Sequence, residues 1–110
     1  MSSPPAYLID HKGRAVLTHI VLFRLKDRSS ENVASTRDRM AALSGRIPQL
    51  RSIHVGINVV TSPNAYDIAL VETFESIDAL KAYQAHPAHL DLLKDVMSSF
   101  ETFASVDYDD

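Results

Sequence analysis

Residues 16–26 read Val-Leu-Thr-His-Ile-Val-Leu-Phe-Arg-Leu-Lys, and this stretch decides the fold. It is rich in β-branched and aromatic residues and contains neither Gly nor Pro, so it predicts a β-strand. Successive side chains of a strand point to opposite faces, which places His19, Val21 and Phe23 on one face and Ile20 and Leu22 on the other. Both faces are apolar at the middle of the strand, so each face needs a cover.

The segment after this strand predicts one amphipathic helix. Ser29 or Ser30 can accept a hydrogen bond from the free amides of a first helical turn, so the helix is expected to begin near Ser30. Gly45 supplies the left-handed residue that ends many helices, and Pro48 prevents the helix from resuming. We therefore expect the helix to end at Gly45.

Alternation of apolar and polar residues predicts the remaining strands. Residues 51–60 and 66–75 alternate on either side of a turn that contains a proline, so they are expected to pair as a hairpin. Residues 101–108 predict a weaker final strand. With a broken helix before that strand, the order of elements matches the ferredoxin-like βαββαβ arrangement. The predicted class is α+β, with one antiparallel sheet and helices on one of its faces.

The broken helix has its corner at residues 83–89, Tyr-Gln-Ala-His-Pro-Ala-His. A helix capped by Ser76 must stop near His86, because Pro87 disfavours a helical residue before it and suits the first turn of a new helix. The corner brings together one phenol and two imidazoles. Imidazole titrates at about 6.5 and a phenol keeps its proton up to about 10, so these groups suit acid–base chemistry near neutral pH.

The second face of the predicted sheet has no cover of its own. If the helices cover the face of Val21, then Ile20, Leu22, Ala69 and Val71 lie on the other face. An apolar surface of this size exceeds what a monomer usually exposes, and a second copy of the sheet is the simplest symmetric cover. We therefore predict a homodimer in which the two sheets face each other.

Composition limits the classes of function. With 110 residues, of which 45% are apolar, the chain is expected to form one domain, residues 16–110, behind a flexible leader of residues 1–15. A net charge of -3 without a basic run argues against nucleic-acid binding. The longest apolar runs are far too short to span a bilayer, so no membrane role is expected and a cytoplasmic location is predicted. The absence of Cys excludes disulfides and thiolate catalysis.

Several segments together make the chain resemble the stress-responsive A/B barrel family, also called Dabb or dimeric α/β barrel proteins. The resemblance covers residues 18–108, and each motif is weak when taken singly. It implies a homodimer of ferredoxin-like subunits, in agreement with the pattern of strands and helices. The segments that carry it are residues 18–26, the pairs Ile47-Pro48 and Val55-Gly56, residues 66–71, residues 74–76 and residues 83–89 with their His-Pro-Ala-His.

The resemblance also suggests a site. One member of the family, olivetolic acid cyclase, closes a linear poly-β-keto thioester by aldol condensation without a metal or organic cofactor. Its catalytic Tyr and His look like Tyr83 and His89, and a further pocket His looks like His19, whereas Ile68 stands where that cyclase has another pocket His. The resemblance therefore implies a cofactor-free enzyme in which His89 is the base and Tyr83 the donor.

Four residues are predicted to contact the substrate, a small hydrophobic or polyketide-like molecule. They are His19, Phe23, Ile68 and His86. Two of them also fit a structural role, since His86 can act as a hinge at the helix corner and His19 can be a buried histidine with a hydrogen-bond partner. A zinc site from His86, His89 and either Asp91 or Glu72 can be drawn, but this spacing is commonplace and no metal is expected.

The sequence leaves three interpretations of function open. The chain can be a cyclase-like enzyme, a non-catalytic stress-response homodimer that binds a small ligand, or a cofactor-free monooxygenase of the dimeric barrel type. Under the second interpretation Tyr83 is a half-buried helix residue and His89 anchors the corner. An open apolar pocket between helices and sheet would favour an enzyme, whereas a space filled by Leu90, Leu93 and Phe100 would favour the second interpretation.

Overall fold

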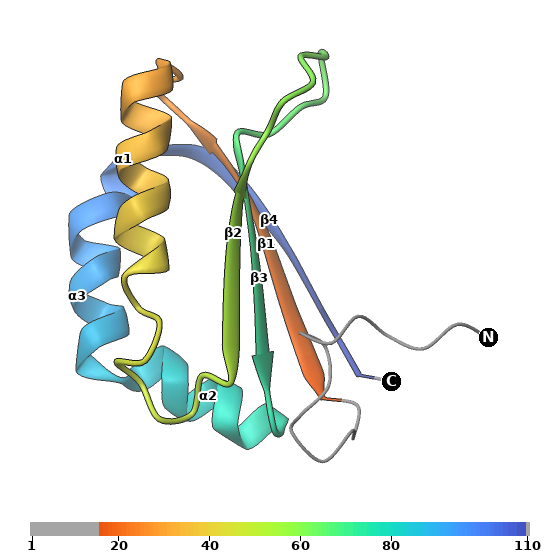
Figure 1. The fold of residues 1–110 in the computed structure, drawn as a ribbon, viewed down its shortest axis with the longest axis vertical. Coiled ribbons are helices and arrows are strands. Elements are labelled where there is room, and N and C mark those ends of the chain that lie inside the picture. The colour runs from red at the N-terminus through yellow and green to blue at the C-terminus, as the bar shows by residue number, and fades with distance from the viewer. Residues whose placement is uncertain (1–15, 110) are drawn as a thin grey trace.

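A computed structural model describes residues 16–109 of the chain, so the predicted leader, residues 1–15, lies outside the described part. The strands form one sheet in the order β2-β3-β1-β4, and each neighbouring pair is antiparallel. This confirms the predicted ferredoxin-like α+β fold. The elements in chain order are β1 (Leu17–Leu25), α1 (Ser30–Ala41), β2 (Ser52–Ile57), β3 (Ile68–Phe74), α2 (Ile77–Ala85), α3 (Pro87–Val96), the 3-10 turn η2 (Met97–Ser99) and β4 (Phe100–Tyr108) (Figure 1).

Helix α1 begins as the sequence predicts but ends earlier. The side chain of Ser29 accepts a hydrogen bond from the amide of Asn32 and caps the helix. The helix ends at Ala41, so the prediction that it ends at Gly45 was wrong. The reason is that tighter turns follow Ala41, and Gly45, with a φ of 77°, belongs to these turns rather than to the helix cap.

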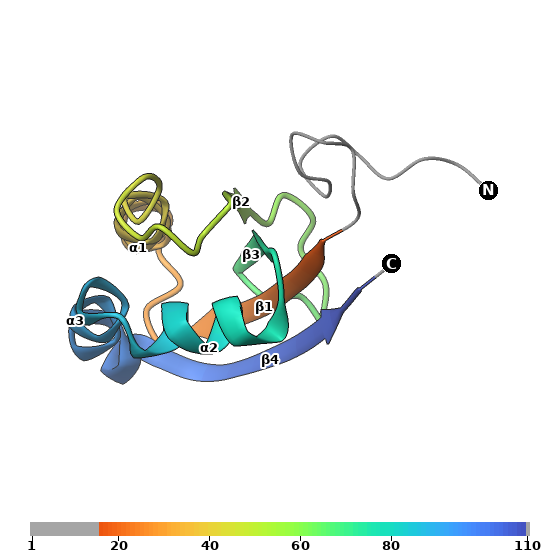
Figure 2. The ribbon, with the colours of Figure 1, turned by 90° about the horizontal axis from the view of Figure 1, so that it is seen from below.

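The helices lie on one face of the sheet, as Figure 2 shows most clearly for α1 and α3. In the register of β1 and β3, Val21 lies opposite Leu70 and Phe23 opposite Ile68, and all four side chains are buried beneath the helices. The same register places His19 opposite Glu72. Two polar side chains therefore lie side by side on the covered face, next to the apolar core.

The other face of the sheet carries apolar side chains that none of the helices within residues 16–109 covers (Figure 2). Ile20 pairs with Val71 of β3 and with Val106 of β4. Leu22, two residues further along β1, lies on the same face as Ile20. Leu22 is 36% exposed and Val106 54% exposed. Within residues 16–109 no helix has the length and apolar character needed to cross a membrane.

Candidate functional site

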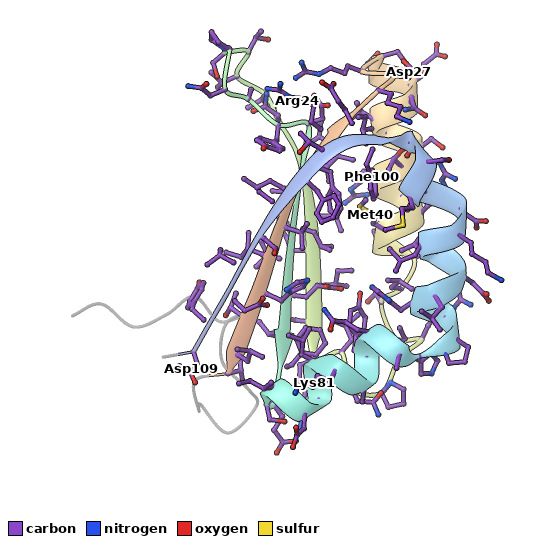
Figure 3. All side chains as sticks on the ribbon, turned by 180° about the vertical axis from the view of Figure 1, so that it is seen from behind. Arg24, Asp27, Met40, Lys81, Phe100 and Asp109 are labelled. Atoms are coloured by element: carbon purple, nitrogen blue, oxygen red, sulfur yellow. The ribbon has the colours of Figure 1, made fainter. Side chains whose placement is uncertain are left out.

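A pocket of about 270 Å³ lies between the covered face of the sheet and α3. Figure 3 shows Phe100, one of its wall residues, and Met40 of the core in the space between sheet and helices. Leu93 and Phe100 form part of the wall, and Leu90 is 46% exposed, so these side chains do not fill the pocket. The lining side chains are His19, Val21, Phe23, Leu70, Glu72, Gln84, His89, Leu93, Met97, Phe100, Phe103 and Ser105.

A wider hollow of about 560 Å³ lies at another part of the molecule, beside the start of α1 and the segment between β2 and β3. Its buried acid, Asp67, accepts hydrogen bonds from the backbone of Leu25 and from Arg28. Because these charged groups already satisfy one another, the hollow offers no reactive group. The smaller pocket, with its two histidines and one glutamate, is therefore the candidate site.

His89 lies in the first turn of α3, where its imidazole contributes to the pocket wall. Its Nδ1 lies 3.1 Å from the carbonyl oxygen of Gln84. A carbonyl only accepts, so Nδ1 carries the hydrogen and the neutral ring has its lone pair on Nε2. Burial lowers the pKa of His89, and the charge of His19 acts in the same direction, against the bond to Gln84. The hydrogen bond to Gln84 and the lowered pKa together leave His89 as a neutral base.

Tyr83 lies under His89 rather than beside the pocket. Its side chain is 1% exposed and its ring centre lies 4.7 Å from that of His89, so the two predicted catalytic rings do come together. The hydroxyl group, however, donates to Oε2 of Glu72, and Tyr83 is not among the residues that line the 270 Å³ pocket. Burial raises the pKa of Tyr83, and the negative charge of Glu72 adds to this effect. Tyr83 therefore remains protonated and donates its hydrogen bond to Glu72.

Glu72 is a site residue that the sequence did not predict. Its side chain is fully buried, and its Oε1 has no hydrogen-bond partner within the described residues. This oxygen lies 4.0 Å from Nε2 of His19, beyond hydrogen-bond reach. Burial raises the pKa of Glu72 to about 7, although the bond from Tyr83 opposes the change. The available signal was an acidic residue on the face of residues 66–75 that is otherwise Tyr, Ile, Leu and Phe.

His19 is held by a second acid, Asp107 of β4. The Nδ1 of His19 lies 2.5 Å from Oδ1 of Asp107, and the register of β1 and β4 places the two residues opposite each other. The carboxylate fixes the hydrogen on Nδ1 and so turns Nε2 toward Glu72. Asp107 was also missed, because the sequence did not indicate how the final strand aligns with the first.

The other residues predicted to bind a substrate fall into two groups. Phe23 lines the pocket, and its contact with a substrate stays a prediction. Ile68 is 2% exposed within the core and does not line the pocket. His86 caps α3, since its Nδ1 accepts a hydrogen bond of 3.1 Å from the amide of Ala88, and it lies outside the pocket wall. Within residues 16–109, no three His, Asp or Glu side chains are grouped so as to hold a metal ion.

The architecture and the pocket define a ferredoxin-like α+β domain with a buried polar cluster beneath a helix corner. Residues 17–110 match the family described as the Stress responsive A/B Barrel Domain, Dabb, and the chain therefore belongs to that family. This confirms the family resemblance found in the sequence. None of the comparisons shows a specific resemblance to olivetolic acid cyclase.

Three known proteins are similar to the chain in sequence or in fold. It is 38% identical over 77 residues to an uncharacterised protein of Streptomyces coelicolor, and the alignment covers 67% of this chain and 79% of that protein. A dimeric protein of unknown function with a ferredoxin-like fold from Bacteroides fragilis is 32% identical, with a TM-score of 0.72 over 86% of this chain and 96% of that one. Hydroxynitrile lyase from Passiflora edulis, 18% identical with a TM-score of 0.74 over 86% and 93%, shares the fold.

Proposed function

We propose that this protein is a cofactor-independent enzyme that forms or breaks a carbon–carbon bond next to a carbonyl group, in the manner of a polyketide cyclase. The observation that carries the proposal is the neutral imidazole of His89 in the wall of an apolar pocket of about 270 Å³. A volume at the lower end of the range for ligand pockets fits a small substrate. The apolar lining favours a substrate with little charge.

Closure of a β-keto chain needs a base that removes a proton from the carbon between two carbonyl groups. Nε2 of His89 is suited to this step, because Gln84 holds the hydrogen on the opposite nitrogen and burial keeps the ring neutral. The negative charge then develops on a carbonyl oxygen, which needs a donor. His19 and Glu72 are the other titratable groups that line the pocket.

One observation favours a second candidate, a non-catalytic stress-response dimer that binds a small ligand. The hydroxyl of Tyr83, the donor expected from the family resemblance, is buried and already bonded to Glu72. A tyrosine in that position can have a purely structural role in the core. Binding of a small apolar molecule in the pocket without turnover would fit this alternative.

Solvent exchange distinguishes the two functions. A β-keto thioester is incubated in deuterated buffer, and proton NMR follows the exchange of the hydrogens between its two carbonyls. We expect the native protein to accelerate exchange and His89→Ala to lower the rate about 100-fold, because a positioned base contributes at least this much. His86→Asn is the matched control, since Asn also caps helices and this position lies outside the pocket. Equal rates with and without protein would remove the enzymatic function.

We also propose that the active form is a homodimer in which the uncovered faces of two sheets meet. The partly exposed Leu22 and Val106 on this face, together with the dimeric state of the similar Bacteroides protein, support the proposal. Sedimentation velocity should give twice the mass of the chain, and Val106→Asp should give a monomer, because the charge would be buried in the interface. A native protein that sediments as a monomer at all concentrations would contradict the dimer.

A further inference from the structure

We propose that Glu72 is the proton donor of this site and holds a carbonyl or enol oxygen of the substrate between its own Oε1 and Nε2 of His19. This inference rests on the proposed function and names the acid that acts together with His89. It assigns to Glu72 the task that the sequence suggested for Tyr83. Tyr83 then becomes the residue that positions the acid.

The bond from Tyr83 decides where the proton of Glu72 lies. The hydroxyl of Tyr83 donates to Oε2, so Oε2 must act as an acceptor. In the neutral carboxyl group the hydrogen therefore lies on Oε1. That oxygen is fully buried, lacks a hydrogen-bond partner within residues 16–109, and belongs to a side chain that lines the pocket. The only donor hydrogen of the carboxyl group is thus at the oxygen that has no partner within these residues.

The separation between Oε1 and Nε2 of His19 has the length that one bridging oxygen atom needs. Oε1 and Nε2 of His19 are 4.0 Å apart, too far for a mutual hydrogen bond. An oxygen about 2.8 Å from each would lie within hydrogen-bond distance of both. A carbonyl oxygen can accept from Glu72, and so can an enol oxygen, with Nε2 of His19 as its second polar neighbour. The pair therefore suits an uncharged carbonyl compound, in keeping with the mainly apolar side chains of the pocket wall.

The titratable groups around Glu72 come from four elements. They are His19 of β1, Tyr83 of α2, His89 of α3 and, behind His19, Asp107 of β4. None of them is a lysine or arginine, so no permanent cation holds Glu72 in its ionised form. Burial raises the pKa of this carboxyl to about 7, so a large fraction is protonated at neutral pH.

The proposed steps balance without any other reactant. His89 takes the proton from the carbon between two carbonyls, the electron pair moves to the carbonyl oxygen, and that oxygen takes the proton from Oε1 of Glu72. In the closing step the enol carbon forms a bond to a second carbonyl carbon of the same chain. The enol oxygen returns its proton to Glu72, and the new alkoxide takes the proton held by His89. Both side chains end in their starting states.

Infrared difference spectroscopy tests the contact without any need for turnover. Acetylacetone with isotope-labelled carbonyl groups is the probe, and the buffer is at about pH 6, below the pKa of Glu72 near 7. We expect the native protein to show one protonated-carboxyl band that moves when the probe binds, together with a shifted carbonyl band of the probe. The carboxyl band should be absent in Glu72→Gln, and both changes should be retained in Glu75→Gln, whose side chain is 62% exposed. A carboxyl band that does not move on binding would overturn the inference.

Turnover separates this inference from the proposed function. With a β-keto thioester, Glu72→Gln should lower kcat about 100-fold, change KM little, and abolish the loss of activity that the native protein shows above about pH 7. Native rates in this variant would overturn the role of Glu72 while leaving His89 as the base. A moving carboxyl band without any exchange of the thioester would instead leave the contact intact and remove the enzymatic function. The amide of Gln can still accept from Tyr83, so the variant is expected to fold.

Discussion

Two buried acids, five positions apart in the chain, differ in the number of hydrogen bonds that their carboxyl groups accept. Asp67, just before β3, is 8% exposed and uses both carboxylate oxygens. It accepts from the amide of Leu25 at 2.9 Å and from Nε of Arg28 at 3.0 and 3.2 Å. The side chain of Glu72, within β3, is fully buried and accepts a hydrogen bond from Tyr83, and its other oxygen has no partner among residues 16–109.

The difference separates a structural acid from a candidate functional one. Asp67 joins the end of β1 to the start of β3, and a guanidinium group compensates its charge, so its burial has a structural benefit. Within the described residues no guanidinium or ammonium group pairs with Glu72, and burial of an incompletely bonded carboxyl group costs stability. A native protein retains such a group where it serves a purpose other than folding. This comparison supports the chemical role proposed for Glu72 and gives no reason to propose one for Asp67.

The largest expected effect concerns the stability cost of Glu72. Its folded-state pKa of about 7 exceeds the ordinary value of 4.5, so between these values the folded protein binds more protons than the unfolded chain. The free energy of unfolding should therefore fall as pH rises from about 4.5 to 7, by about 3 kcal/mol in total at about 1.4 kcal/mol per pH unit. Glu72→Gln should remove this fall. Urea titrations at fixed protein concentration measure both proteins.

Two results decide whether this slope belongs to Glu72. The variant and the native protein should be about equally stable below pH 4.5, and the variant should be more stable above pH 7. Glu75→Gln, which changes an exposed acid next to the same strand, should keep the native slope. If Glu72→Gln retains the slope, the carboxyl group is not protonated in the folded state and the contrast with Asp67 disappears.

The second prediction concerns Asp67, where loss of the carboxylate should lower the free energy of unfolding instead of raising it. Asp67→Asn should lower the free energy of unfolding by about 2 kcal/mol, because hydrogen bonds to a charged group are lost and an amide N–H is brought against the donors of Arg28. Thermal and urea unfolding measure it, and Asp38→Asn, a change at an exposed pair with Arg37, should cost far less. A stabilised Asp67→Asn protein would contradict the structural role.

The fold could be predicted because its signals are local. The β-branched run at residues 16–26, the cap at Ser29 and the break at Pro87 each act through the backbone of a few neighbouring residues. The end of α1 was missed because the turns after Ala41 depend on hydrogen bonds that compete closely with those of a helix. Local pattern thus specifies which elements exist better than where each one ends.

The site was predicted less completely, because its contacts join distant parts of the chain. His19, Phe23 and His89 do line the pocket, and the family resemblance had brought Tyr83 next to His89. The partner of Tyr83, however, depends on how α2 packs on β3, and the partner of His19 depends on the alignment of β1 with β4. No local pattern contains these two alignments, so neither Glu72 nor Asp107 could be assigned from the sequence.

The smallest expected effect concerns Arg28. It tests how much this cation contributes to the difference in stability between the buried Asp67 and the buried Glu72. Arg28 is 45% exposed, so solvent screens its charge, and the geometry of its fork matters more than its charge alone. Arg28→Lys keeps the charge but loses the Nε contacts to both oxygens of Asp67, and should cost about 0.5 kcal/mol. Urea titration of this variant, of Asp67→Asn and of the double variant gives the coupling energy. The double variant should be about as stable as Asp67→Asn alone, since Lys then has no carboxylate to approach. Additive losses would instead mean that the amide of Leu25 alone accounts for the burial of Asp67.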